Sequence, residues 1–342
     1  MRILLLAGSY PPETGGIAQF MRAFAEGLTA RGVEVEVIAN PVLPTGGYLK
    51  RVDACRNEVL RHTQARTFDR IVASSWSPYA VALPPPYDIF CHGMDLLEPS
   101  GSLRYRVLMK RTLKQASRVL ANSHYTAGLA AGFGARAESV VVLHPGVNCE
   151  HFHPAVQRNA SRVILSVGRL VERKGFDIVI RAMPRILESF PDATYICAGE
   201  GPDRERLQEL ASTLEVGSNV NWPGEVNEEQ KLSLDQSAEV FAMPNRIADK
   251  DGSVEGFGIV FLEAAACELP AIGGNSGGAP DAVIDGVTGY LVDPTNVEEV
   301  ATRIIGLLSN PNLRRKMGQA ARQRVMKDFR EDQIAERYLA SL

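Results

Sequence analysis

The sequence has few cysteines, no long apolar run and little net charge, and each absence excludes a class of protein. Its five cysteines are scattered and odd in number, and no CxxC pair occurs, so neither a disulfide framework nor a structural zinc site is indicated. No run of about 18 apolar residues is present, which argues against a membrane-spanning helix. The net charge of -3 implies no general attraction to nucleic acid.

The apolar start of the chain is short as well. The segment MRILLLAGSYPP is too short for a signal peptide and is typical of a first buried strand. With 342 residues, 45% hydrophobic and 23% charged, the chain has the material for two globular domains. We therefore expect a cytoplasmic protein, with a peripheral position on the inner face of the plasma membrane as a further expectation from the basic helix described below.

Short apolar runs alternate with helical spacing along the whole sequence. We expect strands at 2–7, 33–39, 69–73, 87–91, 119–121 and 139–143, and again at 163–167, 194–198, 219–222, 239–243, 270–273 and 288–294. This alternation predicts an α/β protein with two doubly wound parallel sheets facing a central cleft at the carboxyl ends of their strands. We place the domains at 1–154 and 155–328 and expect a helix at 329–342 to pack back on the first domain. The first loop lacks GxGxxG, which argues against a nicotinamide oxidoreductase.

The stretch 253–266, SVEGFGIVFLEAAA, is the most informative part of the sequence. Gly258 is expected at a turn and residues 259–266 form an apolar helical run. A helix beginning near Phe257 would leave Glu255 before its N-terminus and carry Glu263 inside it. The free N–H groups of a helix N-terminus can hold a hydroxyl or phosphate oxygen, and glycine lets a ligand approach the backbone. A sugar and a ribose joined by a diphosphate would present hydroxyls to both carboxylates. The alternative is a buried helix with a structural glutamate, which would need a partner.

Two cations follow the first strand of the second domain. Arg169 offers a planar fork of donors and Lys174 a point charge, a common way to hold a diphosphate and to stabilise charge on a leaving group. Alone, the two residues fit a surface charge pair better than a ligand site. Gly277 and Gly278 also fall on a strand-end loop of this domain, and the combination favours a ligand site.

The first domain offers three further candidates. Gly15 and Gly16 stand at a helix N-terminus, where backbone can approach a phosphate, although they also fit a flexible start of the helix. His92 follows a strand end, where α/β sheets place ligand groups, although a lone histidine is often structural. The histidines of HPGVNCEHFHP, residues 144–154, match no known metal spacing.

A basic amphipathic helix is expected at 103–118. It carries Arg104, Arg106, Lys110, Arg111, Lys114 and Arg118 and no acidic residue. In a mildly acidic protein this pattern favours contact with an anionic membrane surface, and a solvated face is the alternative.

Taken in order, the motifs GRLVERKG, GEGP, EGFGIVFLEAAA, GGNSGGAPD and TGYLVDP resemble glycosyltransferase family 4. The resemblance covers essentially the whole chain and is strongest from 160 to 295. It implies a GT-B fold and a retaining hexosyltransferase that uses a nucleotide sugar. The form AMPNR…VEGFGIVFLEA resembles bacterial GDP-mannose-dependent mannosyltransferases of the phosphatidylinositol mannosyltransferase type.

By this resemblance Arg169 and Lys174 would hold the diphosphate, and Glu255 would contact sugar hydroxyls. Glu263 would bind the ribose, and His92 would lie beside the transferred sugar. The remaining expected binding residues are Gly15 and Gly16 near the phosphate and acceptor, Val226 near the base, and Gly256, Phe257, Gly258 and Ile259 through their backbone. No cofactor or metal is expected. Asp249 and Asp251 form a DxD-like sequence, DKD, which is interpreted as solvated or adjacent to the substrate rather than metal-binding.

The expected reaction is front-face substitution, in which the acceptor hydroxyl attacks from the leaving-group side. The expected donor is GDP-mannose and the acceptor a lipid-linked or glycan hydroxyl. The alternatives are a UDP-sugar donor, a nucleotide-sugar epimerase or hydrolase of the same fold, and a non-catalytic nucleotide-sugar-binding subunit. The chain departs from the family pattern at Glu268, where glycine is common at a helix end, and at Asn148, where aspartate is common.

Overall fold

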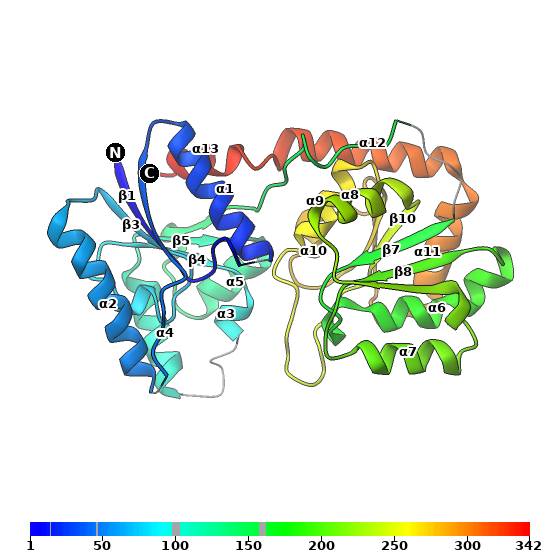
Figure 1. The fold of residues 1–342 in the computed structure, drawn as a ribbon, viewed down its shortest axis with the longest axis horizontal. Helices are drawn as coiled ribbons and strands as arrows, with labels where there is room; N and C mark the ends of the chain where they lie inside the picture. Colours follow the sequence, from blue (N-terminus) through cyan, green and yellow to red (C-terminus); the bar gives the residue numbers. More distant parts are fainter. Residues whose placement is uncertain (14, 46, 98–102, 157–161) are drawn as a thin grey trace. The chain divides into compact units, whose positions relative to one another are not determined.

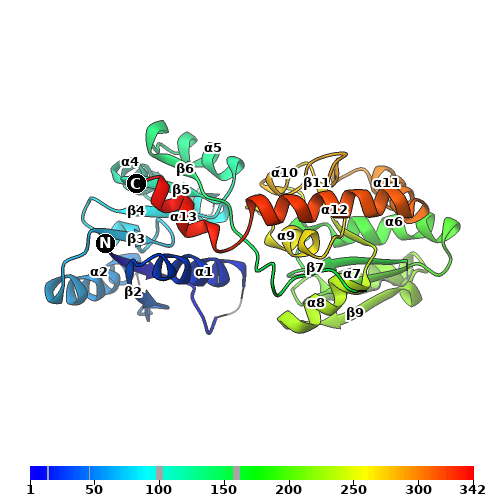
Figure 2. The same cartoon turned by 90° about the horizontal axis from the view of Figure 1, so that it is seen from above.

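Each half of the chain folds around its own sheet in the computed structural model, which describes residues 1–342 except 14, 46, 98–102 and 157–161. One compact unit comprises residues 1–146 with 331–342, and the other comprises 147–330. These bounds lie close to the positions expected from the sequence, 154 and 328. Figure 1 and Figure 2 show each unit from two directions.

The first unit contains a six-stranded parallel sheet in the order β2-β1-β3-β4-β5-β6. Its strands are β1 (Arg2–Ala7), β2 (Glu34–Ala39), β3 (Arg70–Ala73), β4 (Asp88–Cys91), β5 (Arg118–Ala121) and β6 (Val140–Val142). Its helices are α1 (Gly16–Ala30), α2 (Tyr48–Ala65), the short α3 (Met94–Leu97), α4 (Leu103–Gln115), α5 (His124–Gly132) and α13 (Gln333–Ala340). The strand order reverses between β1 and β3, so this unit is doubly wound as predicted.

Alternating residues of β1 face two different helical layers, as a strand buried on both sides requires. Ile3 and Leu5 pack with residues of α1 and α13. Leu4 and Leu6 pack with residues of α2, α4 and α5. Figure 1 shows α1 and α13 on one side of this sheet and α2 and α4 on the other.

The last helix, α13, is held to the first unit by polar contacts as well as by packing. The Tyr338 hydroxyl donates to Asp88 Oδ2 at 2.7 Å, inside the core. Arg118 donates to the carbonyl oxygens of Ser341 and Leu342, both at 2.7 Å. Arg118 was expected in the basic helix, but α4 ends at Gln115 and Arg118 begins β5. Its guanidinium therefore anchors the end of the chain.

The second unit contains a six-stranded parallel sheet in the order β12-β11-β10-β7-β8-β9. Its strands are β7 (Val163–Val167), β8 (Thr194–Ala198), β9 (Val220–Gly224), β10 (Val240–Met243), β11 (Ala271–Gly274) and β12 (Gly289–Val292). Its helices are α6 (Phe176–Ser189), α7 (Arg204–Thr213), α8 (Glu228–Ser237), α9 (Ile259–Ala266), α10 (Ala279–Ala282), α11 (Val297–Ser309) and α12 (Pro311–Asp328).

The second sheet is also covered on both faces. Val240 and Ala242 pack against α6, α7 and α11, whereas Phe241 and Met243 pack against α9, α10 and α12. Figure 1 shows α6 and α7 on the opposite side of the sheet from α8 and α9. The strand order reverses between β7 and β10, and open α/β sheets bind ligands at such a point, outside the strand ends.

The unit 147–330 begins and ends at neighbouring positions. Val147 and Arg330 form a parallel bridge, and the Val147 N–H donates to the Phe329 carbonyl oxygen at 2.8 Å. No helix that the structure describes is long and apolar enough to cross a bilayer.

Candidate active site

The loop after β10 and the helix that follows it lie at the strand-order reversal of the second sheet. Helix α9 spans Ile259–Ala266, the helical run expected from the sequence, and Gly258 takes the left-handed conformation (φ 89°) as its N-cap. A Cβ at Gly258 would lie 2.7 Å from the Phe261 ring. The Ile259 and Val260 N–H groups donate to no residue that the structure describes. They remain available to an oxygen of a ligand.

Two glycines of the β11 loop bring this loop against the approach to α9. A Cβ at Gly277 would lie 2.3 Å from the carbonyl oxygen of Glu255, and one at Gly278 would lie 2.1 Å from that of Gly256. The Gly278 N–H also donates to the Glu255 carbonyl oxygen at 2.9 Å. These glycines therefore permit close backbone packing that fixes the position of Glu255.

The structure brings Lys174 and Glu255 together. Lys174 Nζ lies 2.5 Å from Glu255 Oε2, and both side chains are nearly buried. Lys174 ends a short 3₁₀ turn, Glu172–Lys174, and its Nζ would lie 3.7 Å from a Cβ at Gly168, directly after β7. The next residue, Gly175, is left-handed (φ 74°) and packs against the Pro244 carbonyl group. Segments after β7 and after β10 thus meet at one ion pair.

Arg169 is placed differently from Lys174. It follows Gly168 at the end of β7 and is exposed. Its guanidinium makes no ion pair or hydrogen bond with the residues that the structure describes. A cation directly after β7 that no described residue engages remains free to bind an anion.

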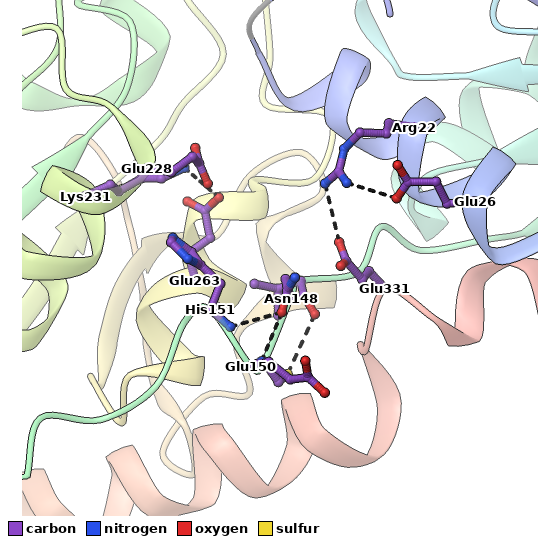
Figure 3. A network of polar contacts seen from close by, with 11 residues as sticks. Arg22, Glu26, Asn148, Glu150, His151, Glu228, Lys231, Glu263 and Glu331 are labelled. Carbon is purple, nitrogen blue, oxygen red and sulfur yellow. Dashed lines mark hydrogen bonds and ion pairs between the residues drawn. The ribbon is translucent and has the colours of Figure 1, made fainter. Parts of the chain in front are cut away.

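Glu263 is buried in α9 and pairs with a lysine that sequence reasoning did not select. Lys231 Nζ, from α8, lies 2.8 Å from Glu263 Oε1 and 2.9 Å from Glu228 Oε1. Figure 3 shows the three side chains converging. Burial raises the pKa of Glu263, although the Lys231 charge acts against this shift. Burial lowers the pKa of Lys231, but Glu263 and then Glu228 outweigh it and raise the value overall.

The other oxygen of the Glu263 carboxylate, Oε2, is buried and has no hydrogen-bond partner among the described residues. The positive charge of Lys174 also acts to lower the pKa of this carboxyl group. Glu255, Lys174, Glu263 and Lys231, in that order, therefore form one chain of alternating charge between the loops after β7 and β10 and the helices α8 and α9. An unpartnered buried oxygen in such a chain fits a hydroxyl donor from a ligand.

The remaining expected residues of this unit have mainly structural surroundings. Phe257 is buried and its ring lies 6.0 Å from that of Phe329. Val226 is half-buried and packs on the same apolar cluster. Gly256 is buried and Ile259 is half-buried. The side chains of Phe257, Val226 and Ile259 pack in one apolar cluster and hold the loop.

Arg246, in the loop after β10, was not selected from the sequence either. The Arg246 guanidinium donates to both carboxylate oxygens of Asp177, each at 3.0 Å. The backbone N–H of Arg246 donates to the Arg173 carbonyl oxygen at 2.9 Å. The guanidinium fork ties the loop to the start of α6, and the backbone hydrogen bond ties it to the turn that carries Lys174. Asp249 and Asp251 lie in the same loop and are exposed, and Asp251 accepts from the Ser253 N–H at 2.8 Å.

His92 lies in the first unit, just past β4. Its Nε2 lies 3.0 Å from the Ser74 carbonyl oxygen, and this acceptor requires a proton on Nε2. Ser74 follows β3, and its hydroxyl accepts from the Gly8 N–H at 2.8 Å. The surrounding protein desolvates the imidazole and lowers its pKa to about 4. His92 is therefore neutral near pH 7, with Nδ1 left as an acceptor.

Gly15 and Gly16 lie at the start of α1 and are exposed. Gly15 has a φ of 123°, and a Cβ there would meet nothing within 4 Å. Glycine at this position serves the backbone conformation, which other residues rarely adopt.

Helix α4 turns part of its apolar surface inward. Met109 and Leu113 are fully buried in the core, whereas Leu103 and Val107 are 77% and 62% exposed. The basic residues Arg104, Arg106, Lys110, Arg111 and Lys114 are all exposed. The outer surface of the helix therefore combines cations with two apolar side chains.

Both halves of the chain match known protein families. The family "Glycosyl transferases group 1" matches residues 150–324, and "Glycosyltransferase Family 4" matches residues 14–151. A GDP-mannose-dependent alpha-(1-6)-phosphatidylinositol monomannoside mannosyltransferase from Mycolicibacterium smegmatis is 31% identical, over 94% of this chain and 92% of its own. A related mannosyltransferase from Corynebacterium glutamicum, named for a monoacylated acceptor, is 29% identical over 98% of this chain and 96% of its own.

Solved structures with the same fold are more distant in sequence. Sucrose-phosphate synthase from Thermosynechococcus elongatus has a TM-score of 0.83 at 20% identity, over 99% of this chain and 97% of its own. The HepE protein of Anabaena, solved with UDP-glucose, has a TM-score of 0.78 at 22% identity over 100% of both chains. These two likenesses show the GT-B fold. Together with the family matches over both halves and the mannosyltransferase relatives, they establish that the chain is a hexosyltransferase belonging to glycosyltransferase family 4.

Proposed function

We propose that the protein transfers mannose from GDP-mannose to a hydroxyl of a lipid-linked or glycan acceptor, with retention of anomeric configuration. The observation that carries this proposal is the Lys174–Glu255 pair at the strand-order reversal, 2.5 Å between Nζ and Oε2, with the exposed Arg169 directly after β7. The donor is suggested by relatives about 30% identical over nearly the whole chain that are named as GDP-mannose-dependent.

In this proposal Lys174 and Arg169 bind the diphosphate, and Glu255 accepts hydrogen bonds from sugar hydroxyls. The diphosphate gains negative charge as the bond to the anomeric carbon breaks, and the two cations stabilise that charge without a metal ion. Glu255 loses part of its contact with Lys174 when the phosphate arrives and is then free to accept from the sugar. Glu263 accepts from the ribose through Oε2. The backbone of 256–259 completes the site beside the free N–H groups of α9.

The reaction is proposed as a front-face substitution. The acceptor oxygen forms a bond to the anomeric carbon on the side from which the phosphate oxygen leaves, and that phosphate oxygen takes the acceptor proton. Glu255 is paired with Lys174 and is assigned to hydrogen bonding rather than to covalent attack. A glycosyl-enzyme adduct trapped and located by mass spectrometry would contradict this mechanism, because it would require a double displacement.

The acceptor side is proposed to approach an anionic membrane from the cytoplasm, through the outer surface of α4. The exposed cations there, with Leu103 and Val107, suit a surface of acidic lipid headgroups. The phosphatidylinositol-based acceptors named for the relatives belong to such a membrane.

The donor is tested by thermal shift with GDP-mannose, UDP-glucose, UDP-N-acetylglucosamine, GDP and UDP, on wild type and on Arg169→Ala. Binding of GDP-mannose should raise the melting temperature of wild type by several degrees at 100 times Kd. The shift should fall in Arg169→Ala. A response confined to uracil nucleotides would replace the donor by a UDP-sugar, the ligand class of the HepE structure. No response to either class would contradict the proposed donor site.

A further inference from the structure

Lys231 is the one residue of the charge chain that belongs to α8. The N-terminus of this helix is fixed by a capping box, in which Asn227 and Gln230 exchange hydrogen bonds of 2.9 and 3.0 Å. The Lys231 side chain is 12% exposed and Nζ lies 5.2 Å from the centre of the Phe152 ring. A lysine held this firmly loses side-chain entropy, so its contacts must offset that loss.

The two oxygens of the Glu263 carboxylate have different surroundings. Oε1 accepts from Lys231 at 2.8 Å, and Oε2 is buried without a partner among the described residues. The side chain of Glu263 is only 5% exposed, so neither oxygen is freely hydrated. A carboxylate anchored at one oxygen cannot rotate without losing a charge-assisted hydrogen bond. The other oxygen is therefore presented in a fixed direction.

We propose that Lys231 is a positioning residue that sets ribose specificity, by anchoring Glu263 Oε1 so that Oε2 accepts a hydroxyl of a ribonucleoside diphosphate. This inference rests on the proposed function, because it assigns the ligand of Glu263 within the same donor site. Glu228 Oε1 also lies 2.9 Å from Lys231 Nζ and helps to hold it. A nucleotide that lacks the hydroxyl leaves Oε2 unpaired, and an unpaired buried acceptor is costly.

The test compares GDP, 2′-deoxy-GDP and 3′-deoxy-GDP, and the matching uracil nucleotides, by isothermal titration calorimetry. Wild type should bind the ribonucleotide roughly tenfold or more tightly than the weaker deoxy form, the ratio expected when a hydrogen bond to a charged group is lost. Lys231→Met should lose most of this ratio, and Lys231→Arg should retain most of it. Lys316→Met, the same change at an exposed position of α12, should match wild type.

Turnover adds a readout that general destabilisation would not give. In Lys231→Met the KM for the donor should rise roughly tenfold while kcat stays within about twofold. The reason is that the ribose contact is made equally in the donor complex and in the transition state. If Lys231→Met does not fold, Lys231→Gln carries the same comparison with a smaller change of volume. An unchanged ribose-to-deoxyribose ratio in a folded Lys231 variant overturns the inference. Failure of wild type to bind any of the nucleotides overturns the proposed function itself.

Discussion

At the scale of single residues, Glu268 shows how the chain departs from what its backbone favours. The residue follows the end of α9 and has a φ of 59°, in the left-handed region. Glycine is common at this position in the family, and here a glutamate takes the conformation that glycine adopts without strain. Asn148, the other departure, accepts the Glu150 and His151 N–H groups at 3.0 Å each and stabilises its own turn.

Glu268→Gly should therefore stabilise the protein by about 1 kcal/mol, because glycine adopts the left-handed conformation without strain. Urea unfolding would measure this as a higher midpoint with an unchanged slope. Glu209→Gly, at an exposed position inside α7, is the matched control and should destabilise by about 1 kcal/mol. A lower midpoint for Glu268→Gly would show that the glutamate side chain contributes more than the strain costs.

The neutral state of His92 gives a second prediction at this scale. Its pKa in the folded protein is about 4, below the ordinary value of 6.5, because burial disfavours the imidazolium. The unfolded chain therefore binds more protons between these two values. Stability from this group is complete above about pH 6.5 and is lost as the pH falls toward 4.

Nitrogen-15 NMR of histidine-labelled protein should show His92 protonated only at Nε2 from pH 8 down to pH 5, about one unit above its pKa. His92→Gln, which removes the titrating group, should weaken the loss of stability between pH 6 and pH 4.5. Titration of the His92 resonance near its ordinary value would contradict the desolvated environment. Equal pH dependence of stability in both proteins would do the same.

At the scale of elements, apolar runs were enough to place the strands, but long-range pairs were not visible in the sequence. The strands of both sheets fall within a few residues of their expected ranges, since buried parallel strands are continuous apolar runs. Lys231 was missed because its partner lies 32 residues away on another helix. Within NEEQK the lysine is typical of a solvated helix start. Arg246 was missed for the same reason, since Asp177 lies 69 residues away.

Element ends were also harder to predict than element types. The basic helix was expected to continue to Arg118, but α4 ends at Gln115. Ala116 is buried, and Arg118 is the first residue of β5. The start of α9 was easier to place, because the expected turn at Gly258 is a left-handed N-cap and the helical run begins at Ile259 as expected. Spacing of apolar residues reports which face is buried, not where the backbone changes conformation.

Helix α4 carries the prediction on membranes. Charge reversal at Lys110, Arg111 and Lys114 should abolish binding to vesicles that contain anionic phospholipid, since each cation near such a surface contributes about 1 kcal/mol. Flotation of vesicles in a density gradient measures the bound fraction. A matched reversal at Arg315, Lys316 and Lys327, exposed on α12, should leave binding intact. Equal binding by wild type and the α4 variant would remove the membrane from the proposal.

At the scale of the whole molecule, the return of α13 makes the first unit depend on both ends of the chain. Tyr338 donates to Asp88, which is fully buried, and burial raises the pKa of that carboxyl. Asp88 also lies near Arg118, which binds the last carbonyl groups. One polar cluster inside the sheet therefore joins β4, β5 and α13.

Tyr338→Phe should destabilise the first unit by about 1–3 kcal/mol, because Asp88 Oδ2 loses its donor while it remains buried. Hydrogen exchange during chemical denaturation would follow the two units separately. In the variant, only the amides of 1–146 and 331–342 should exchange faster than in wild type. Tyr290→Phe, at a half-buried ring beside Arg303, is the control and should have little effect. Equal loss of protection in both units would show that they unfold as one.

The bridge between Val147 and Arg330 has a consequence for the order in which the protein is made. Residues 147–330 form an insertion within the other unit, with its two ends adjacent. On the ribosome this insertion is complete before α13 has emerged, so it can close its own sheet and core first. The N-terminal unit is translated earlier but must wait for Tyr338 to fill its core. The part synthesised first is therefore the part that finishes folding last.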